Sequence, residues 1–223
     1  MSPRSTALKS RILNTAHAMF SEKGYERATV NEIIDHLNIS KGAFYHYFKS
    51  KQEVLDEIIL IYIHEVVELL YQIAYDNTLN GLEKYKKMFV EIQRMRKQNY
   101  HKYAFLTRLL LHKDNLLFQH RYTEKTLELT KPPFVHILQQ GVKERLFVIL
   151  NPEETAELIL RFGNIYRAKI ARLSIALKDN PNNQIKIRNI IEFMQDTIER
   201  LLGVKSGQLD FILENFESST TIE

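Results

Sequence analysis

The 223-residue sequence contains no cysteine and no tryptophan, and it has only seven glycines and five prolines. Without cysteine, disulfide bonds, thiolate metal sites and cysteine nucleophiles are all excluded. So few chain-breaking residues leave little room for the many turns of a sheet protein, and apolar residues recur at spacings of three and four throughout. The sequence therefore predicts an all-α protein.

Long apolar runs and catalytic motifs are also missing. The most apolar stretch, residues 58–73, is interrupted by His64, Glu65 and Glu68, so it falls short of the roughly 20 apolar residues that span a bilayer. There is no apolar signal core at the amino terminus, no glycine-rich phosphate loop, no H-E-x-x-H motif and no nucleophile elbow. We therefore expect a soluble, cytoplasmic protein with no membrane partner, no cofactor and no bound metal. A helical enzyme, the alternative from another class, has no motif in its support.

Three helix starts lie close together between residues 29 and 53. Thr29 and Glu32 have the spacing of a capping box, Ser40 is placed to cap a second helix, and Ser50 with Glu53 forms another capping box. Two very short helices joined by a tight connection, and followed by a much longer helix, are typical of a DNA-binding helix-turn-helix.

The second short helix has more aromatic and basic side chains than it can bury. Phe44 and Phe48 share one face at a spacing of four, so we expect them in the core. Gly42 costs roughly 1 kcal/mol in a helix, so its presence indicates close approach by another surface. Duplex DNA is such a surface, because its major groove admits a helix. The alternative is a small helical corner whose tyrosine and lysine side chains are simply solvated.

The charge distribution favours the DNA-binding interpretation. Residues 1–51 contain eight Lys and Arg against four acidic residues, whereas the remaining 172 residues carry 23 of each sign. All of the net charge of +4 therefore belongs to the segment with the predicted helix-turn-helix, as expected for a phosphate-binding module joined to a neutral domain.

From about residue 8 to residue 64 the chain resembles the DNA-binding domain of the tetracycline-repressor (TetR) family of bacterial transcription regulators. The motifs are I-L-N-T-A-H-A-M-F-S-E-K-G-Y at 12–25, T-V-N-E-I at 29–33 and S-K-G-A-F-Y-H-Y-F-K-S-K at 40–51. The rest of the chain resembles the family only in its helical character and its length. The resemblance implies an N-terminal three-helix helix-turn-helix domain and a larger helical domain for ligand binding and dimerisation.

The resemblance also implies which residues meet DNA. Phosphate contacts are expected from Thr29, Tyr45, His46 and Lys51. The residues expected against the major groove are Lys41, Gly42, Ala43 and Tyr45, and Ser40 and Tyr47 complete the predicted DNA-binding set. Because Ala43 offers only a methyl contact, for instance to thymine, the operator sequence is not readable from the chain.

We expect three segments along the chain: a DNA-binding domain over residues 1–51, an effector-binding and dimerisation domain over 52–217, and a polar tail over 218–223. A linking helix from Ser50 continues to about residue 76. The other long helices are expected at 7–23, 82–97, 100–112, 115–144, 152–178 and 184–202, with a short terminal helix within 206–216. Pro132 and Pro133 predict that the helix over 115–144 is kinked or split.

The last two long helices offer apolar residues in a regular stripe. The predicted dimer interface consists of Ile159, Gly163, Tyr166, Ile170, Ile187, Ile191, Met194, Ile198 and Leu201. Two such helices from each protomer would form a four-helix bundle across a two-fold axis. The alternative is that the stripe packs inside the monomer.

The middle of the chain is rich in aromatic residues, which favours an apolar or aromatic effector. The candidate effector-binding residues are Tyr62, Tyr71, Phe89, Gln93, Tyr103, Phe105, Arg108, Phe118, Phe162 and Tyr166. The resulting hypothesis is a homodimeric transcriptional repressor that binds an inverted-repeat operator in double-stranded DNA and is released by an unidentified small molecule. The alternative is an architectural, sequence-neutral DNA-binding protein without an effector.

Overall fold

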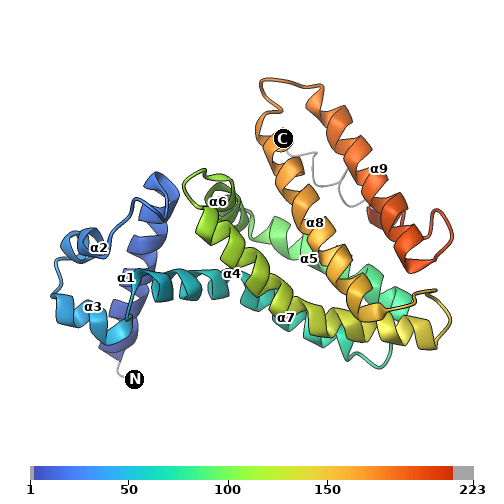
Figure 1. Ribbon diagram of the computed structural model, residues 1–223, viewed down its shortest axis with the longest axis horizontal. Helices are drawn as coiled ribbons and strands as arrows, with labels where there is room; N and C mark the ends of the chain where they lie inside the picture. Colours follow the sequence, from blue (N-terminus) through green and yellow to red (C-terminus); the bar gives the residue numbers. More distant parts are fainter. Residues whose placement is uncertain (1–2, 213–223) are drawn as a thin grey trace. The chain divides into compact units, whose positions relative to one another are not determined.

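The computed structural model describes residues 3–212, and the described residues form helices and no strands (Figure 1). The helices are α1 (Pro3–Lys23), α2 (Val30–Leu37), α3 (Lys41–Tyr47), α4 (Lys51–Ala74), α5 (Gly81–Gln98), α6 (Tyr100–Leu111), α7 (Leu116–Lys143), α8 (Pro152–Ile175) and α9 (Asn183–Leu202). The predicted all-α class is confirmed. Within residues 3–212, no helix has the length and apolar character needed to cross a membrane.

The predicted helix starts are confirmed by their caps. Thr29 caps α2 in a complete capping box with Glu32, and Ser40 Oγ accepts a hydrogen bond from the Ala43 amide at 3.1 Å. Ser50 Oγ accepts from the Glu53 amide at 3.1 Å at the start of α4. These bonds satisfy amide groups that have no partner inside the helix, so each short helix has a defined first turn.

Two features of the predicted helices differ from the structure. Helix α1 begins at Pro3 instead of about residue 7, and α7 is not split at Pro132 and Pro133. The two prolines remove two backbone donors, but Phe134 and Ile137 in the following turns are fully buried. We attribute the continuity of α7 to this burial, which offsets the lost hydrogen bonds. In the predicted terminal helix, residues 211–212 are helical; residues 213–216 and the polar tail lie outside the described residues.

The chain folds into two compact units. Unit 1 comprises residues 3–64 and 101–125, and unit 2 comprises 65–100 and 126–212. Helices α4 and α7 each begin in unit 1 and end in unit 2. The first compact unit thus extends past the predicted boundary at residue 51 and includes α6. The division of the chain by function stays a prediction.

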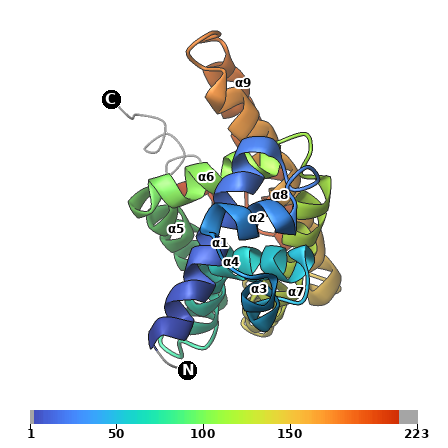
Figure 2. The same cartoon turned by 90° about the vertical axis from the view of Figure 1, so that its left-hand side faces the viewer.

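Unit 1 is built around the amino-terminal helices (Figure 2). Helix α1 contacts α2, and α2 contacts α3. The side chains of unit 1 that are fully removed from solvent include Ile12, Ala16, Phe20, Ile33, Phe44, Val54, Leu55, Leu109 and Phe118. Helix α6 and the start of α7 therefore contribute to the same buried core as the helix-turn-helix.

A fully buried asparagine, Asn115, connects three segments of unit 1. Its side-chain Nδ2 donates to the carbonyl oxygen of Phe20 at 3.2 Å and to that of Leu109 at 3.0 Å. Its Oδ1 accepts a hydrogen bond from the Tyr25 amide. One carboxamide thus ties the end of α1, the connection between α1 and α2, and the end of α6.

Gly24 allows the connection between α6 and α7 to lie close to the end of α1. Its φ is +91°, and a β-carbon there would lie 2.8 Å from the Cβ of Asp114. The Asp114 carbonyl accepts from the Glu26 amide at 3.3 Å, and the Asp114 carboxylate pairs with Arg27. Only glycine satisfies both the backbone conformation and the close approach.

Unit 2 holds the apolar stripe that was predicted as a dimer interface. Helices α8 and α9 pack side by side (Figure 1), and the buried core of unit 2 includes six of the nine predicted interface residues, namely Ile159, Ile170, Ile187, Ile191, Met194 and Ile198. These side chains pack within their own chain, and their assignment as partner contacts stays a prediction. The pattern of a single helix cannot distinguish packing within the monomer from packing against a second copy, because both produce the same apolar stripe.

The Asn115 connection predicts a large loss of stability when it is removed. Because Asn115→Ala removes three hydrogen bonds to the backbone of buried residues, we expect the free energy of unfolding to fall by about 2–4 kcal/mol. Urea unfolding followed by circular dichroism measures this loss. The exposed Asn77 is the matched control, and Asn77→Ala should change the free energy by less than about 0.5 kcal/mol. Equal effects of the two substitutions would contradict the role given to Asn115.

Candidate nucleic-acid interface

The turn between α2 and α3 is set by the end of α2. Asn38 adopts the left-handed conformation, with φ 51° and ψ 52°, and its amide donates to the Asp35 carbonyl at 3.1 Å. The Ile39 amide donates to the Ile34 carbonyl at 3.2 Å. Asparagine tolerates this conformation better than most residues, so the chain turns sharply here and α3 starts three residues later.

Helix α3 has one buried and one exposed face. Phe44 and Phe48 are fully buried, with their ring centroids 6.0 Å apart, as the sequence predicted. The exposed residues of α3 are Lys41, Gly42, Tyr45 and His46, and the preceding Ser40 is exposed as well. Tyr45 is 52% exposed, with its ring edge-on to the Phe44 ring. Half-buried Ala43 and Tyr47 lie between the two faces.

Gly42 has open space around it. Among the described residues, a β-carbon on Gly42 would meet only Ser40 Oγ, at 3.9 Å. Neither its backbone conformation nor packing within unit 1 therefore requires glycine at this position, in contrast to Gly24. The remaining physical reason for a glycine is the close approach of another molecule.

Thr29 and Glu32 hold the start of α2. The Thr29 amide and hydroxyl each donate to the Glu32 carboxylate at 2.8 Å, and Lys23 also donates to this carboxylate. The hydrogen bonds from Lys23 and Thr29 lower the pKa of the Glu32 carboxyl to about 2. Its contribution to stability is therefore complete above pH 4.5 and is lost as the pH falls towards 2. Thr29 remains exposed, where a phosphate contact is sterically open.

The Lys51 ammonium forms hydrogen bonds within the protein. Its Nζ donates to the carbonyl oxygens of Tyr25 at 2.8 Å and Ala28 at 2.9 Å, and it lies 4.1 Å from the centroid of the Tyr25 ring. Burial lowers the pKa of the Lys51 amine. The ammonium thus stabilises the connection between α1 and α2, a role that the sequence did not reveal. Its expected phosphate contact stays a prediction.

Several cations of the amino-terminal segment are paired within unit 1. Lys9 pairs with Glu57 at 2.9 Å, and Lys23 and Arg27 pair with Glu32 and Asp114. In the described part of the chain, no ion pair involves Lys41 or Lys49, and both are exposed at the two ends of α3. The positive charge that is available to an external anion therefore includes these two lysines.

The predicted effector residues do not form one site. Tyr71 is exposed and stacks on Tyr75, Phe89 meets Phe211 in unit 2, and Phe118 is buried in unit 1. Phe162 and Tyr166 lie together on α8 beside Phe193 of α9. Gln93 and Tyr103 are half-buried on α5 and α6, and Arg108 lies 5.4 Å from the ring centroid of its neighbour Phe105.

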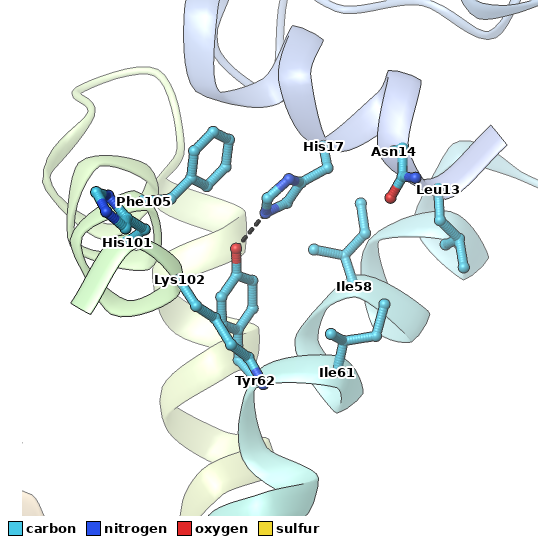
Figure 3. Close-up of a pocket in the computed structure, with 9 residues that line it drawn as sticks. All are labelled: Leu13, Asn14, His17, Ile58, Ile61, Tyr62, His101, Lys102 and Phe105. Carbon is cyan, nitrogen blue, oxygen red and sulfur yellow. Dashed lines mark hydrogen bonds between the residues drawn. The ribbon is translucent and has the colours of Figure 1, made fainter. Parts of the chain in front are cut away.

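Tyr62 and Phe105, by contrast, line a cavity of about 360 Å³ in unit 1 (Figure 3). Three helices form its wall, with three residues each from α1, α4 and α6. They are Leu13, Asn14 and His17; Ile58, Ile61 and Tyr62; and His101, Lys102 and Phe105. The sequence reasoning missed the contribution of α1, because nothing in the pattern of α1 indicates that it faces α6.

Comparisons with known proteins agree with this architecture. A family profile described as "Bacterial regulatory proteins, tetR family" matches residues 12–58. The chain is 28% identical over 159 residues to the HTH-type transcriptional repressor KstR2 of Mycobacterium tuberculosis, a match covering 69% of this chain and 74% of that protein. That relative is named as a transcriptional repressor.

Solved structures show the same fold. A tetR-family regulatory protein from Rhodococcus RHA1 has a TM-score of 0.58 at 19% identity, covering 92% of this chain and all of that one. SmeT, the repressor of a Stenotrophomonas maltophilia multidrug efflux pump, has a TM-score of 0.60 at 17% identity, covering 90% of this chain and 92% of that one. At these identities the likeness concerns the fold.

The open space at Gly42 generates a prediction in which stability and DNA binding change in opposite directions. Because alanine favours a helix, Gly42→Ala should raise the free energy of unfolding by about 0.5 kcal/mol. If duplex DNA approaches this position, the added methyl group should weaken DNA binding roughly tenfold. Thermal unfolding and fluorescence anisotropy with labelled duplex measure the two effects.

The exposed Gln139 of α7 provides the control, since Gln139→Ala also improves helix propensity but lies outside the helix-turn-helix. It should leave DNA affinity unchanged. A Gly42→Ala protein with undiminished DNA affinity would show that DNA does not approach this side of α3.

Proposed function

Because the chain belongs to the TetR family of bacterial transcription regulators, we propose that it is a dimeric repressor that binds an inverted-repeat operator and is released by a small, mainly apolar or aromatic effector. The observation that carries DNA binding is the exposed face of α3, where Lys41, Gly42, Tyr45 and His46 lie opposite the buried phenylalanines. Side chains at the start of such a helix reach base edges, and neighbouring cations and hydroxyls hold phosphates.

An inverted-repeat target requires two copies of α3. Recognition helices related by a two-fold axis reach successive major grooves when they lie about 34–36 Å apart. A repressor of this kind therefore needs a stable surface for its second copy. Because most of the predicted stripe is buried within the chain, that surface is sought among the exposed apolar residues of α8 and α9.

A partly exposed aromatic cluster on α8 and α9 supports the dimer. The ring centroids of Phe162 and Tyr166 lie 4.8 Å apart, and that of Phe193 lies 6.0 and 5.7 Å from them. Phe193 is 51% exposed and the neighbouring Ile165 is 66% exposed. A β-carbon on Gly163 would have no neighbour within 4 Å. We assign this aromatic cluster to the interface with a second copy, where Gly163 and Tyr166 keep their predicted role.

Release by an effector is supported by the cavity in unit 1 and by its neighbouring helices. SmeT, which shares the fold, is described in a complex with triclosan, with a TM-score of 0.65 at 17% identity. In this chain, α1 and α4 both line the cavity and both belong to the unit that holds the helix-turn-helix. Because the bacterial chromosome lies in the cytoplasm, we expect the protein and its effector to act in the cytoplasm.

The operator proposal predicts strong sequence discrimination. A duplex selected from a random pool should contain an inverted repeat and bind at least about 10³-fold more tightly than a shuffled duplex at the same salt concentration. Lys41→Ala should remove about 1–3 kcal/mol of discrimination at one base pair of each half-site. The exposed Lys143 of α7 serves as the matched control. Equal affinity for selected and shuffled duplexes would instead favour a sequence-neutral architectural protein.

The aromatic cluster predicts which substitutions separate the protomers. Ile165→Asp with Phe193→Asp should yield folded monomers, because both side chains are exposed in the single chain and would bury charge only in a dimer. Analytical ultracentrifugation measures the mass, and circular dichroism verifies that the helices remain. Operator affinity should fall because dimerisation is lost.

Two controls define the result. Leu116→Asp alters an equally exposed apolar residue of α7 and should leave the dimer intact. Ile191→Asp places a charge in the core of unit 2 and should unfold the protein, with a loss of about 3–5 kcal/mol. An intact dimer in the Ile165→Asp, Phe193→Asp variant would locate the interface on another surface.

A further inference from the structure

The cavity between α1, α4 and α6 has an apolar interior. Leu13, Ile58 and the rings of Tyr62 and Phe105 supply most of its wall. Ile61 also lines the cavity (Figure 3), and because this side chain is 49% exposed, we place it at the edge of the cavity. A volume of about 360 Å³ is at the small end of the range for ligand sites. These features suit a compact ligand with an apolar body.

Two polar side chains in the wall of the cavity form a hydrogen bond with each other. The His17 Nε2 atom is hydrogen-bonded to the Tyr62 hydroxyl, and the His17 ring stacks on Phe105 with centroids 3.9 Å apart. Burial lowers the pKa of the His17 imidazole to about 4 and raises the pKa of the Tyr62 phenol. Both groups are therefore neutral at physiological pH, and neither supplies charge to a ligand.

The charge at the cavity comes from Lys102. Its ammonium lies 5.9 Å from the centroid of the Tyr62 ring, and Lys102 is one of the nine described residues that line the cavity. His101 and Asn14 add further hydrogen-bonding groups at the wall. The cavity thus combines an apolar interior with one cationic group, which complements a molecule that has an apolar body and one anionic group.

We propose that this cavity binds a small amphipathic carboxylate, with its apolar body between α1, α4 and α6 and its carboxylate towards Lys102. Binding itself requires no DNA, whereas the regulatory consequence rests on the proposed function. The same α1 and α4 that line the cavity hold the helix-turn-helix in unit 1, so a ligand that contacts both changes operator affinity if it prefers one arrangement of these helices. Linkage then requires operator DNA to change ligand affinity by the same factor.

The test uses two probes of equal size, 4-phenylbutanoate and 4-phenylbutan-1-ol, titrated into the full chain by isothermal calorimetry. The carboxylate should bind about tenfold more tightly than the alcohol, the effect expected for one charge-assisted contact. Lys102→Gln should abolish this preference, and Lys102→Arg should keep it. Lys113→Gln removes a lysine of unit 1 outside the cavity and should also keep it.

A second variant tests whether the apolar body of the ligand lies in the cavity. Ile61→Trp narrows the opening at an exposed position, so the fold should persist while the affinity for both probes falls at least about tenfold. A carboxylate preference that survives Lys102→Gln, or affinities that survive Ile61→Trp, would overturn the proposal. Absence of binding by either probe to the unmodified chain would overturn it as well.

Operator affinity measured without ligand separates this proposal from the proposed function. If the chain binds its selected inverted repeat but neither probe, the cavity proposal fails and the DNA-binding function stands. If the probes bind as described but no duplex is preferred over a shuffled one, the carboxylate site stands and the repressor proposal fails. Carboxylate binding that leaves operator affinity unchanged would overturn the regulatory part.

Discussion

The side chain of Asn115 is the contact on which the arrangement of unit 1 depends. It bonds to the carbonyls of Phe20 and Leu109 and to the amide of Tyr25, and thereby joins the end of α1 and the connection after it to the end of α6. In a buried setting, a missing partner for any of them is costly. The close approach at Gly24 and the Arg27–Asp114 pair act at the same place. The helix-turn-helix is therefore braced by the α6–α7 connection as well as by its own core.

This bracing gives α6 two functions in one short helix. Its first two turns line the cavity through His101, Lys102 and Phe105, and the carbonyl of Leu109 near its end is held by Asn115. A molecule in the cavity contacts the beginning of the helix, whereas its end is fixed to the connection between α1 and α2. A shift of α6 would therefore strain the bonds of Asn115 or displace the connection that precedes α2. Under the proposed function, these contacts connect the cavity with the helix-turn-helix through α6.

Local chemistry explains which features the sequence could predict. The caps at Thr29 and Ser40, the buried pair Phe44 and Phe48 and the end of the first helix at residue 23 all depend on neighbours within a few residues, and all are confirmed. The cavity, the Asn115 contacts and the division of α8 and α9 into buried and exposed faces depend on partners distant in sequence. An apolar stripe such as that of α9 indicates burial but does not identify the covering element. The effector residues were dispersed for the same reason, since aromatic content alone does not locate a cavity.

Gly24, Gly42, Lys41 and Lys51 of unit 1 show how structure separates internal from external roles. Gly24 is required by its φ and by Asp114, whereas Gly42 has no such neighbour within the described residues. Lys51 donates to backbone carbonyls, whereas Lys41 is exposed beside Gly42 on the outer face of α3. Fold stability should therefore depend on Gly24 and Lys51, and recognition on Gly42 and Lys41. Neighbouring residues of the same motif thus have different physical roles. Those that make no contact needed by the fold are available to DNA.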